Sequence, residues 1–439
     1  MKKAIILIMV SVLVLTGCQK AGGEAVSSFV QSVLESQEES IAADIPRMDS
    51  LDNLKLIDKE AVNVKKYGAV GDGVTDDAPA IQKAIDQSKT AVYVPPGTYF
   101  VGSEINLKRR NTGLFSDGAG AVFHLKNDTT GILCSNISNV IVQGLNIKKD
   151  WIDDSVKYGM LITYSKKVIV NKCEVSGFSA RGGVFFDFCE DVEASENYIH
   201  DFSASGFGPL ADGAQADSLG IGANHTKRAL FKKNKVENLE IKDPNRSQRM
   251  VQSDGINSST SEDITFEDNE IRNVGEGMDI GHNKRTIIRN NKVFDVAHYG
   301  IKVIHGSEDS IIEGNYLEEC GFAGICCAAG AGKNGVTQRN VFKNNTIKNT
   351  AKNDYFPLYV PQKRAGILLE GNPLTEGGIS NGCTNNTFEK NKIIDESEPP
   401  TTHYGILERE VAVNNIFKDN EISANILMQI VANGETGGV

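Results

Sequence analysis

Two acidic residues in the middle of the chain are spaced so that they could act as a pair. Asp254 and Glu276 each precede a glycine that opens an apolar-x-apolar segment, and the two segments are one sequence repeat apart. Two carboxyl groups held close together titrate at different pH values, because the charge of the first to ionise raises the pKa of the second. Hydrolysis of a glycosidic bond uses such a pair, one member protonated and one ionised. We therefore predict Asp254 and Glu276 as the acid and base of a glycoside hydrolase that requires no cofactor.

Polar residues on the same and neighbouring repeats extend this pair into a patch. We predict Asp279 and Lys302 as a second catalytic pair. The spacing of the nearby histidines does not indicate a metal site, since nothing fixes their direction. We predict that these histidines bind sugar together with one asparagine and one tyrosine. The predicted sugar-binding residues are Asn257, Tyr299, His282, His305 and His225.

The same patch is compatible with two other functions. A polysaccharide lyase would neutralise the carboxylate of a uronic acid and abstract the adjacent proton, with Lys302, Tyr299 or a histidine as base. In a lyase, Asp279 and Asn257 would offer oxygen ligands to a calcium ion. In the third interpretation Lys302 and Asp279 form a surface salt bridge of little energetic weight. The protein would then bind glycan or present its loops without catalysis.

The elements that would position these residues recur along the chain. One unit is a glycine before an apolar-x-apolar strand, with a base period of 22 to 24 residues. The other is Asn-x-apolar, at Asn197, Asn234, Asn269, Asn291, Asn315, Asn345, Asn391 and Asn420. This period is one coil of a parallel β-helix, with three short strands per coil and neighbouring coils about 4.8 Å apart. We predict an all-β, single-stranded right-handed parallel β-helix over residues 61–430, in which the asparagines form a ladder between coils.

Side chains alternate along a strand, so the second residue after each glycine should point outward. In successive coils these residues are Leu161, Phe185, Gly222, Asn257, Asp279, Lys302, Cys326, Leu368 and Leu407. Three polar members therefore face solvent on three middle coils, between apolar or small ones. Insertions at 201–219, 238–254 and 328–365 exceed the period and are predicted to leave the helix as loops around this patch.

The start of the repeat region carries a recognisable block of sequence. It reads YGAVGDGVTDDAPAIQKAI from Tyr67, followed by VYVPPGTY from Val92. The block resembles the opening of the pectate-lyase-like superfamily, in which a helix covers the first coil of the β-helix. That resemblance implies a capping helix over Ala80–Ile85, with Asp76 or Asp77 at its N-cap, and a structural role for the Asp and Gly residues.

Within that superfamily the middle coils are similar to family 28 polygalacturonases, which carry NTDG, GDD, GHG and RIK motifs on consecutive coils. The alignment matches Asp254 to the Asp of the first motif and Glu276 to the general acid of the second. Gly275 and Tyr299 replace the other Asp and the His, and Ile325-Cys326-Cys327 replaces RIK. These departures argue against inverting hydrolysis of galacturonan. The stretch from Asp279 also faintly resembles family 6 alginate lyases through Asn283-Lys284.

The N-terminus resembles a bacterial lipoprotein signal. Lys2 and Lys3 precede an apolar stretch of twelve residues, Ala4 to Leu15, which is too short to span a bilayer. It leads into Leu15-Thr16-Gly17-Cys18. We predict a signal peptide over 1–18, lipidation of Cys18 and a tether over 19–60. The protein would then be exported and anchored to a membrane of the bacterial cell envelope.

Composition limits the partners. The net charge of −11 argues against nucleic acid, because phosphate binding needs clustered Lys and Arg. The expected partner is a polysaccharide. Seven cysteines follow Cys18 without CxxC spacing, which argues against a disulfide framework or a zinc cluster. We predict that most of them are buried.

Overall fold

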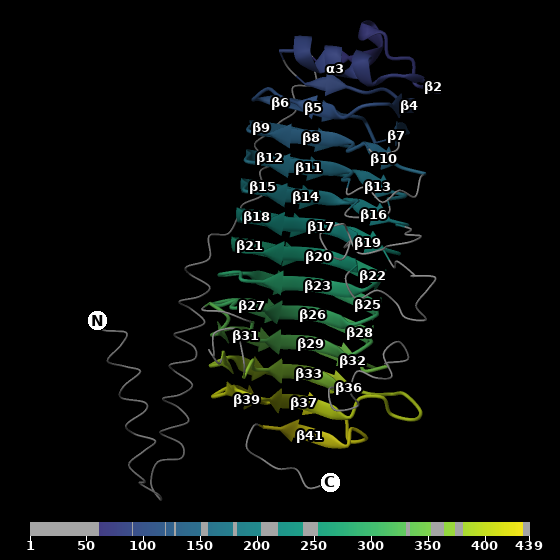
Figure 1. Cartoon of the computed structure of the whole chain (residues 1–439). Helices are drawn as coiled ribbons and strands as arrows, with labels where there is room; N and C mark the ends of the chain where they lie inside the picture. The colour runs from purple at the N-terminus through teal and green to yellow at the C-terminus, as the bar shows by residue number, and fades with distance from the viewer. Residues whose placement is uncertain are drawn as a thin grey trace, which may run out of the picture. The chain divides into compact units, whose positions relative to one another are not determined.

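A computed structural model describes residues 61–89, 91–118, 120–126, 129–150, 157–178, 182–202, 218–239, 253–330, 334–352, 364–373 and 381–432. Most of these residues lie in short strands that form parallel sheets (Figure 1). None of the helices in these ranges is long and apolar enough to cross a membrane. The predicted signal peptide with Cys18 and the tether lie outside the described residues.

Three long sheets run the length of the repeat region. The first contains β1 Val62–Asn63, β3 Val92–Tyr93, β6 Thr112–Phe115, β9 Ser138–Gln143, β12 Lys166–Asn171, β15 Glu190–Ser195, β18 Lys227–Lys232, β21 Glu262–Glu267, β24 Ile287–Arg289, β27 Ile311–Glu313, β31 Val341–Lys343, β35 Thr387–Glu389 and β39 Ile416–Lys418. The second contains β2 Asp72–Asp76, β4 Gly97–Val101, β7 Ala121–Leu125, β10 Asn146–Lys148, β13 Glu174–Ser176, β16 Tyr198–His200, β19 Lys235–Glu237, β22 Glu270–Val274, β25 Lys292–Val296, β28 Tyr316–Cys320, β32 Thr346–Lys348, β36 Lys392–Ile394 and β40 Glu421–Ile422. The third contains β5 Ile105–Leu107, β8 Ile132–Ser135, β11 Met160–Thr163, β14 Val184–Asp187, β17 Ser218–Asn224, β20 Ser253–Ser259, β23 Glu276–Gly281, β26 Tyr299–Ile304, β29 Ala323–Ala328, β33 Ala365–Glu370, β37 Tyr404–Arg409 and β41 Met428–Val431. A small sheet adds β30 Thr337–Gln338, β34 Cys383–Thr384 and β38 Ala412–Val413.

Consecutive strands visit the three sheets in turn, so each strand pairs with the equivalent strand of the next coil. All the pairings between strands of the three long sheets are parallel. Such connections are right-handed because a right-twisted strand packs back onto its sheet only in that sense. The predicted right-handed parallel β-helix is therefore confirmed.

The repeated glycines occupy an inside corner where each coil bends into the third sheet. A Cβ added at Gly277 would lie 2.3 Å from the carbonyl oxygen of Gly300 and 2.6 Å from Val293. At Gly255 the same atom would lie 2.5 Å from Ile271. Because the corner has no room for a side chain, the glycine column follows from packing.

The predicted asparagine ladder is present and is a main polar feature of the core. Asn291 donates from its side chain to Asn315 at 3.0 Å and to the carbonyl of Phe266 at 3.1 Å, and accepts from Asn269 at 2.9 Å. These amides are buried, and a buried polar group is stable only when it is hydrogen-bonded. Each asparagine thus joins its own coil to both neighbours.

The N-terminal end is covered by the predicted helix, α3 Ala78–Gln87, after a short 3₁₀ turn, η2 Val64–Tyr67. Asp77 stands at the N-cap, but its carboxylate accepts from the backbone amides of Val70 and Gly71. Asp76 accepts from the amides of Ala78 and Gly102 instead. The acidic residues of the opening block are therefore structural, as the sequence predicted.

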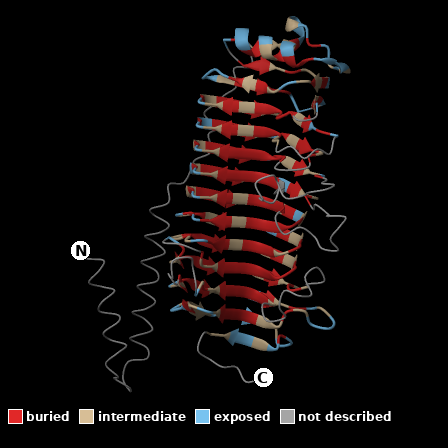
Figure 2. Cartoon of the chain, in the orientation of Figure 1, coloured by how far each residue is buried: buried red, intermediate tan, exposed pale blue. Residues whose placement is uncertain are grey.

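The outward column of the third sheet has the predicted register from Leu161 to Leu407. Figure 2 shows that the strands of this sheet are largely buried, while exposed residues gather on α3 and β41. Outward-pointing Cys326 and Leu368 are also buried, in an apolar cluster with Tyr299 and Phe322. All seven cysteines after Cys18 are buried and unpaired.

The glycine corner can be tested with two substitutions on one strand. Gly277→Ala should lower the free energy of unfolding by about 1–3 kcal/mol, because the new methyl group overlaps backbone and core atoms. Gly281→Ala is the control, since its Cβ would meet no atom closer than 3.6 Å. Urea unfolding of both variants measures the difference, and equal stabilities would contradict the packing explanation.

Candidate active site

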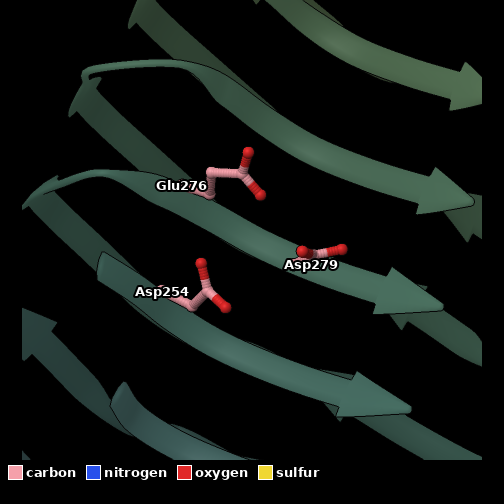
Figure 3. Close-up of side chains that lie close together, drawn as sticks. All are labelled: Asp254, Glu276 and Asp279. Atoms are coloured by element: carbon pink, nitrogen blue, oxygen red, sulfur yellow. The ribbon is translucent and has the colours of Figure 1, made fainter. Parts of the chain in front are cut away.

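Three carboxyl groups gather on two neighbouring strands of the third sheet. Asp254 on β20 is in register with Glu276 on β23, and Asp279 follows on β23. One oxygen of each lies within 4.8 Å of the others, and Figure 3 shows all three side chains close together on these two strands. The amide of Asn257 donates to Asp254 at 3.0 Å. The structure thus brings together the acidic residues that the sequence singled out.

Two cationic or basic side chains from the next coil contact this cluster. The ammonium of Lys302, on β26, lies 2.8 Å from Glu276 and 3.0 Å from Asp279. On its other oxygen Glu276 contacts Nδ1 of His298 at 2.6 Å. Glu276 is fully buried, whereas the side chains of Asp279, Lys302 and His298 are 15%, 14% and 16% exposed. Solvent therefore reaches the cluster beside these three groups.

The charges divide the two acids of β23 into different protonation states. Burial opposes ionisation of Glu276, but the hydrogen bond from His298 and the charge of Lys302 hold its pKa below the ordinary value. Burial and the charge of Glu276 raise the pKa of Asp279 to about 7. Burial disfavours the charged form of Lys302, but the two carboxylates outweigh it and raise its pKa. The family resemblance matched Glu276 to the general acid, but of these two carboxyl groups it is that of Asp279 whose pKa is raised toward neutrality.

The cluster does not fit a calcium ion. Calcium takes six to eight oxygen ligands, and the acidic cluster offers three carboxyl groups. The ammonium of Lys302 lies between two of them, and His298 contacts Glu276 from the other side. Asn257 turns its amide nitrogen to Asp254. The predicted calcium ligation by Asp279 and Asn257 is therefore not supported by this geometry.

Tyr299 does not lie where a sugar-binding role would require. It is 7% exposed and belongs to the apolar cluster on β26, β29 and β33. Burial raises the pKa of its phenol well above the ordinary value. Its ring packs against those of His298 and Phe322. Tyr299 thus supports His298 by packing, which corrects the predicted role.

The other predicted histidines lie at the turns that follow the third sheet. His282 and His305 stack with ring centroids 5.4 Å apart. His225 contacts Asp187 through Nδ1 at 3.0 Å. Burial lowers the pKa of both His282 and His305. His305 is near enough to the cluster that the charges of Lys302 and Glu276 act on its pKa. Asn283 is fully buried in a turn and Lys284 is exposed, which makes Asn283 structural.

Sequence analysis missed His298. Its neighbour Tyr299 is aligned with Glu276 by the glycine repeat, and His298 is one residue outside that column. Its backbone amide bonds to Gly275 of the previous coil at 2.9 Å, which brings the ring beside Glu276. A search for polar residues two positions before each glycine would have found it. Most of the inserted segments predicted to surround the patch (203–217, 240–252, 331–333 and 353–363) lie outside the described residues.

Sequence comparisons identify a repeat family. The family described as right handed beta helix region matches residues 130–316 and 212–373, which together span more than half of the chain. The family described as rhamnogalacturonase A/epimerase, pectate lyase-like, matches residues 61–157. The second match covers the opening block, so the predicted resemblance to the pectate-lyase-like superfamily is confirmed.

Individual relatives are distant. A preneck appendage protein of Bacillus phage PZA is 30% identical over 214 residues, which are 42% of this chain and 24% of the relative. The mannuronan C-5 epimerase A-module of Azotobacter vinelandii superposes with a TM-score of 0.67 at 19% identity, covering 85% of this chain and 98% of that one. The surface adhesin PfbA of Streptococcus pneumoniae superposes with a TM-score of 0.56 at 15% identity, covering 86% and 96%. At these identities the superpositions establish the fold alone.

The raised pKa of Asp279 predicts a pH dependence of stability. Its folded pKa of about 7 exceeds the ordinary value of 3.8, so the stability it contributes is complete below 3.8 and is lost as pH rises to about 7. Asp279→Asn should remove this loss and flatten the curve of unfolding free energy against pH in that window. Asp268→Asn, at an exposed turn, is the control. An unchanged slope in Asp279→Asn would contradict the assignment.

Lys302 contacts both Glu276 and Asp279. Lys302→Met leaves two buried carboxyl groups without it, and should cost about 3–5 kcal/mol of unfolding free energy near neutral pH. The loss should shrink in acid, where both groups are protonated, and the double variant with Glu276→Gln should regain part of it. Lys292→Met, on the exposed side of β25, is the control for urea unfolding. A loss that is equal at both pH values would show that packing, not charge, is responsible.

Proposed function

The chain belongs to the right-handed β-helix family, and from this premise we propose that it hydrolyses glycosidic bonds of a polysaccharide. One observation carries the proposal: Asp279 has a pKa of about 7 and lies within 4.8 Å of other carboxyl groups. A carboxylic acid that stays protonated near neutrality beside a second carboxyl group is the arrangement that glycoside hydrolysis uses. Fold analogy alone would not support an activity.

The positions suggest a role for each group. Asp279, which solvent reaches, would protonate the glycosidic oxygen as the bond to the sugar breaks. Asp254 would attack the anomeric carbon and form a glycosyl ester. Asp279 would then take a proton from water, whose oxygen attacks the same carbon and releases Asp254. A separation under about 5.5 Å between the two carboxyl groups is typical of this retaining mechanism, and their oxygens lie within 4.8 Å.

The pKa of Asp279 would be set by its surroundings, which include Glu276, Lys302 and His298. The charge of Glu276 raises the pKa of Asp279, and that of Lys302 opposes the rise. Without Lys302, two buried carboxyl groups would both resist ionisation; without Glu276, Asp279 would ionise at lower pH. These three residues would therefore position and tune the acid and leave bond cleavage to the two aspartates.

A second candidate rests on His298. Glu276 is held ionised and contacts Nδ1 of His298, so a proton abstracted by this ring would go to Nε2. Protonated Asp279 and the ammonium of Lys302 would offset the carboxylate of a uronic acid while His298 removes the adjacent C5 proton. A mannuronan epimerase shares the fold. The match to the phage appendage protein spans only a quarter of that relative, so the activity of a whole relative is not transferred.

The experiment uses the chain without residues 1–18, the predicted signal peptide, and a panel of neutral and uronic polysaccharides. We expect new reducing ends without the ultraviolet absorbance of an unsaturated uronate. The rate should fall as pH rises above about 7, where Asp279 loses its proton. Asp279→Asn and Asp254→Asn should each lower kcat by at least about a hundredfold, the scale of general acid–base catalysis. Asp268→Asn, at the exposed turn, should leave kcat unchanged.

Other outcomes would separate the alternatives. Ultraviolet absorbance that is lost in His298→Gln and retained in Asp254→Asn would establish proton abstraction and overturn the hydrolytic assignment. Binding of a polysaccharide without cleavage or epimerisation would establish a binding protein. The pneumococcal protein PfbA, which shares the fold, is named a surface adhesin.

Export and membrane attachment through Cys18 remain predictions from the sequence, and mass spectrometry of the mature N-terminus tests them.

A further inference from the structure

The turns that follow the third sheet carry one residue per coil in the left-handed conformation. The backbone amide of each donates to the carbonyl of the residue just before its equivalent in the next coil, for example Thr260 to Gly281 at 3.0 Å. The φ angles of these residues lie between 46° and 56°. The column consists of Asn136, Tyr164, Phe188, His225, Thr260, His282 and His305.

Flat side chains in this column stack from coil to coil. The rings of Tyr164 and Phe188 are 5.0 Å apart with planes 6° from parallel. Those of Phe188 and His225 are 4.3 Å apart and 2° from parallel. After Thr260 the stack resumes with His282 and His305 at 5.4 Å and 19°. From Tyr164 to His305 each coil therefore supplies one ring plane, except at Thr260.

Thr260 leaves a slot between two imidazole faces. His225 and His282 are two coils apart. Twice the spacing between neighbouring strands places them roughly 10 Å from each other. One ring plane fits between them at the separation seen elsewhere in the stack. A depression of about 290 Å³, partly open to solvent, lies here and is lined by residues that include His225, Thr260 and His282. Thr260 is exposed and has a φ of 52°, which a β-branched residue rarely adopts.

The rim of the slot is charged. The residues two positions after His225, Thr260 and His282 are Lys227, Glu262 and Lys284. These three are in register on neighbouring coils. Lys227 contacts Glu262 at 3.3 Å, and Lys284 contacts Glu308 at 2.9 Å. The slot itself is lined by two ammonium groups and one carboxylate, in a chain with a net charge of −11. Each ammonium group carries three N–H donors, so besides its ion pair it can donate to an anionic group of a ligand.

We propose that the slot between His225 and His282 is a binding subsite for one uronic acid ring of the polysaccharide. The sugar ring takes the place of the missing ring plane, with its C–H faces against the negative faces of the two imidazoles. Its carboxylate accepts hydrogen bonds from Lys227 and Lys284. Glu262 accepts from a sugar hydroxyl. The inference rests on the proposed function, since it assumes a polysaccharide ligand.

The subsite is close enough to the carboxyl cluster to bind the same polymer chain. Asp279 and His282 are three residues apart along β23 and its turn, which is roughly 10 Å in an extended strand. Burial lowers the pKa of His282, so near neutral pH its imidazole presents an uncharged face. A sugar held in the slot would fix which bond of the chain reaches Asp279.

The test fills the slot with a ring from the protein itself. Thr260→Tyr should fold, because Tyr164 and Phe188 occupy the same position with the same φ. Thr260→Ser, which keeps the slot open, is the matched control. Binding is measured by calorimetry in the Asp279→Asn background, which prevents cleavage, with hexasaccharides of galacturonic acid, mannuronic acid and glucose. Thr260→Tyr should weaken binding of a uronic hexasaccharide about tenfold relative to Thr260→Ser, the scale of one stacked ring.

A second readout follows the rings directly. With ¹³C-labelled histidine, the signals of His225 and His282, assigned with His→Gln variants, should shift on adding the uronic hexasaccharide, and those of His124 and His403 should not. Binding that leaves these signals and the Thr260→Tyr affinity unchanged would overturn the subsite and leave the proposed function standing. Shifts with the glucose hexasaccharide alone would overturn the uronate assignment. Absence of binding or cleavage with every probe would remove the proposed function as well.

Discussion

Registration of one coil on the next is the constraint on which the rest of the structure depends. Parallel strands about 4.8 Å apart force residues at equal positions of successive coils to be neighbours. The glycine corner and the asparagine ladder fix this register, one because a side chain would overlap the next coil and the other through buried amide bonds. The register therefore decides which side chains meet, wherever they lie in the sequence.

Registration brings two acids of like charge together, and the site must offset their repulsion. Asp254 and Glu276 are direct neighbours across β20 and β23, and Asp279 lies beside them. Lys302 and His298 come from the following coil and contact Glu276. Lys302 lowers the pKa of both carboxyl groups, whereas burial and the charge of Glu276 raise that of Asp279, and the hydrogen bond from His298 lowers that of Glu276. The acid–base asymmetry thus follows from which neighbours register places beside each acid.

Much of this was predictable from the sequence because it depends on period. Counting from each glycine gave the outward column from Leu161 to Leu407 and the pairing of Asp254 with Glu276, and both are present. The protonation states were not predictable, because they depend on Lys302, whose side chain contacts Glu276 and Asp279 on the previous coil. The period of the sequence does not show the direction of that side chain. His298 was missed because it lies outside the column that the period defines, and Tyr299 was misassigned because its neighbours on later coils bury it.

The same constraint places the polar members of the outward column on the middle coils. The outward column is apolar at Leu161 and Phe185 and again from Cys326 onward, and the later members are packed together. Between these apolar members, Asn257, Asp279 and Lys302 give the column three successive polar side chains. The ring stack at the adjacent turn is interrupted within these same coils, at Thr260. Two columns with independent packing requirements therefore change character at one level of the helix, which is expected if one extended ligand contacts both.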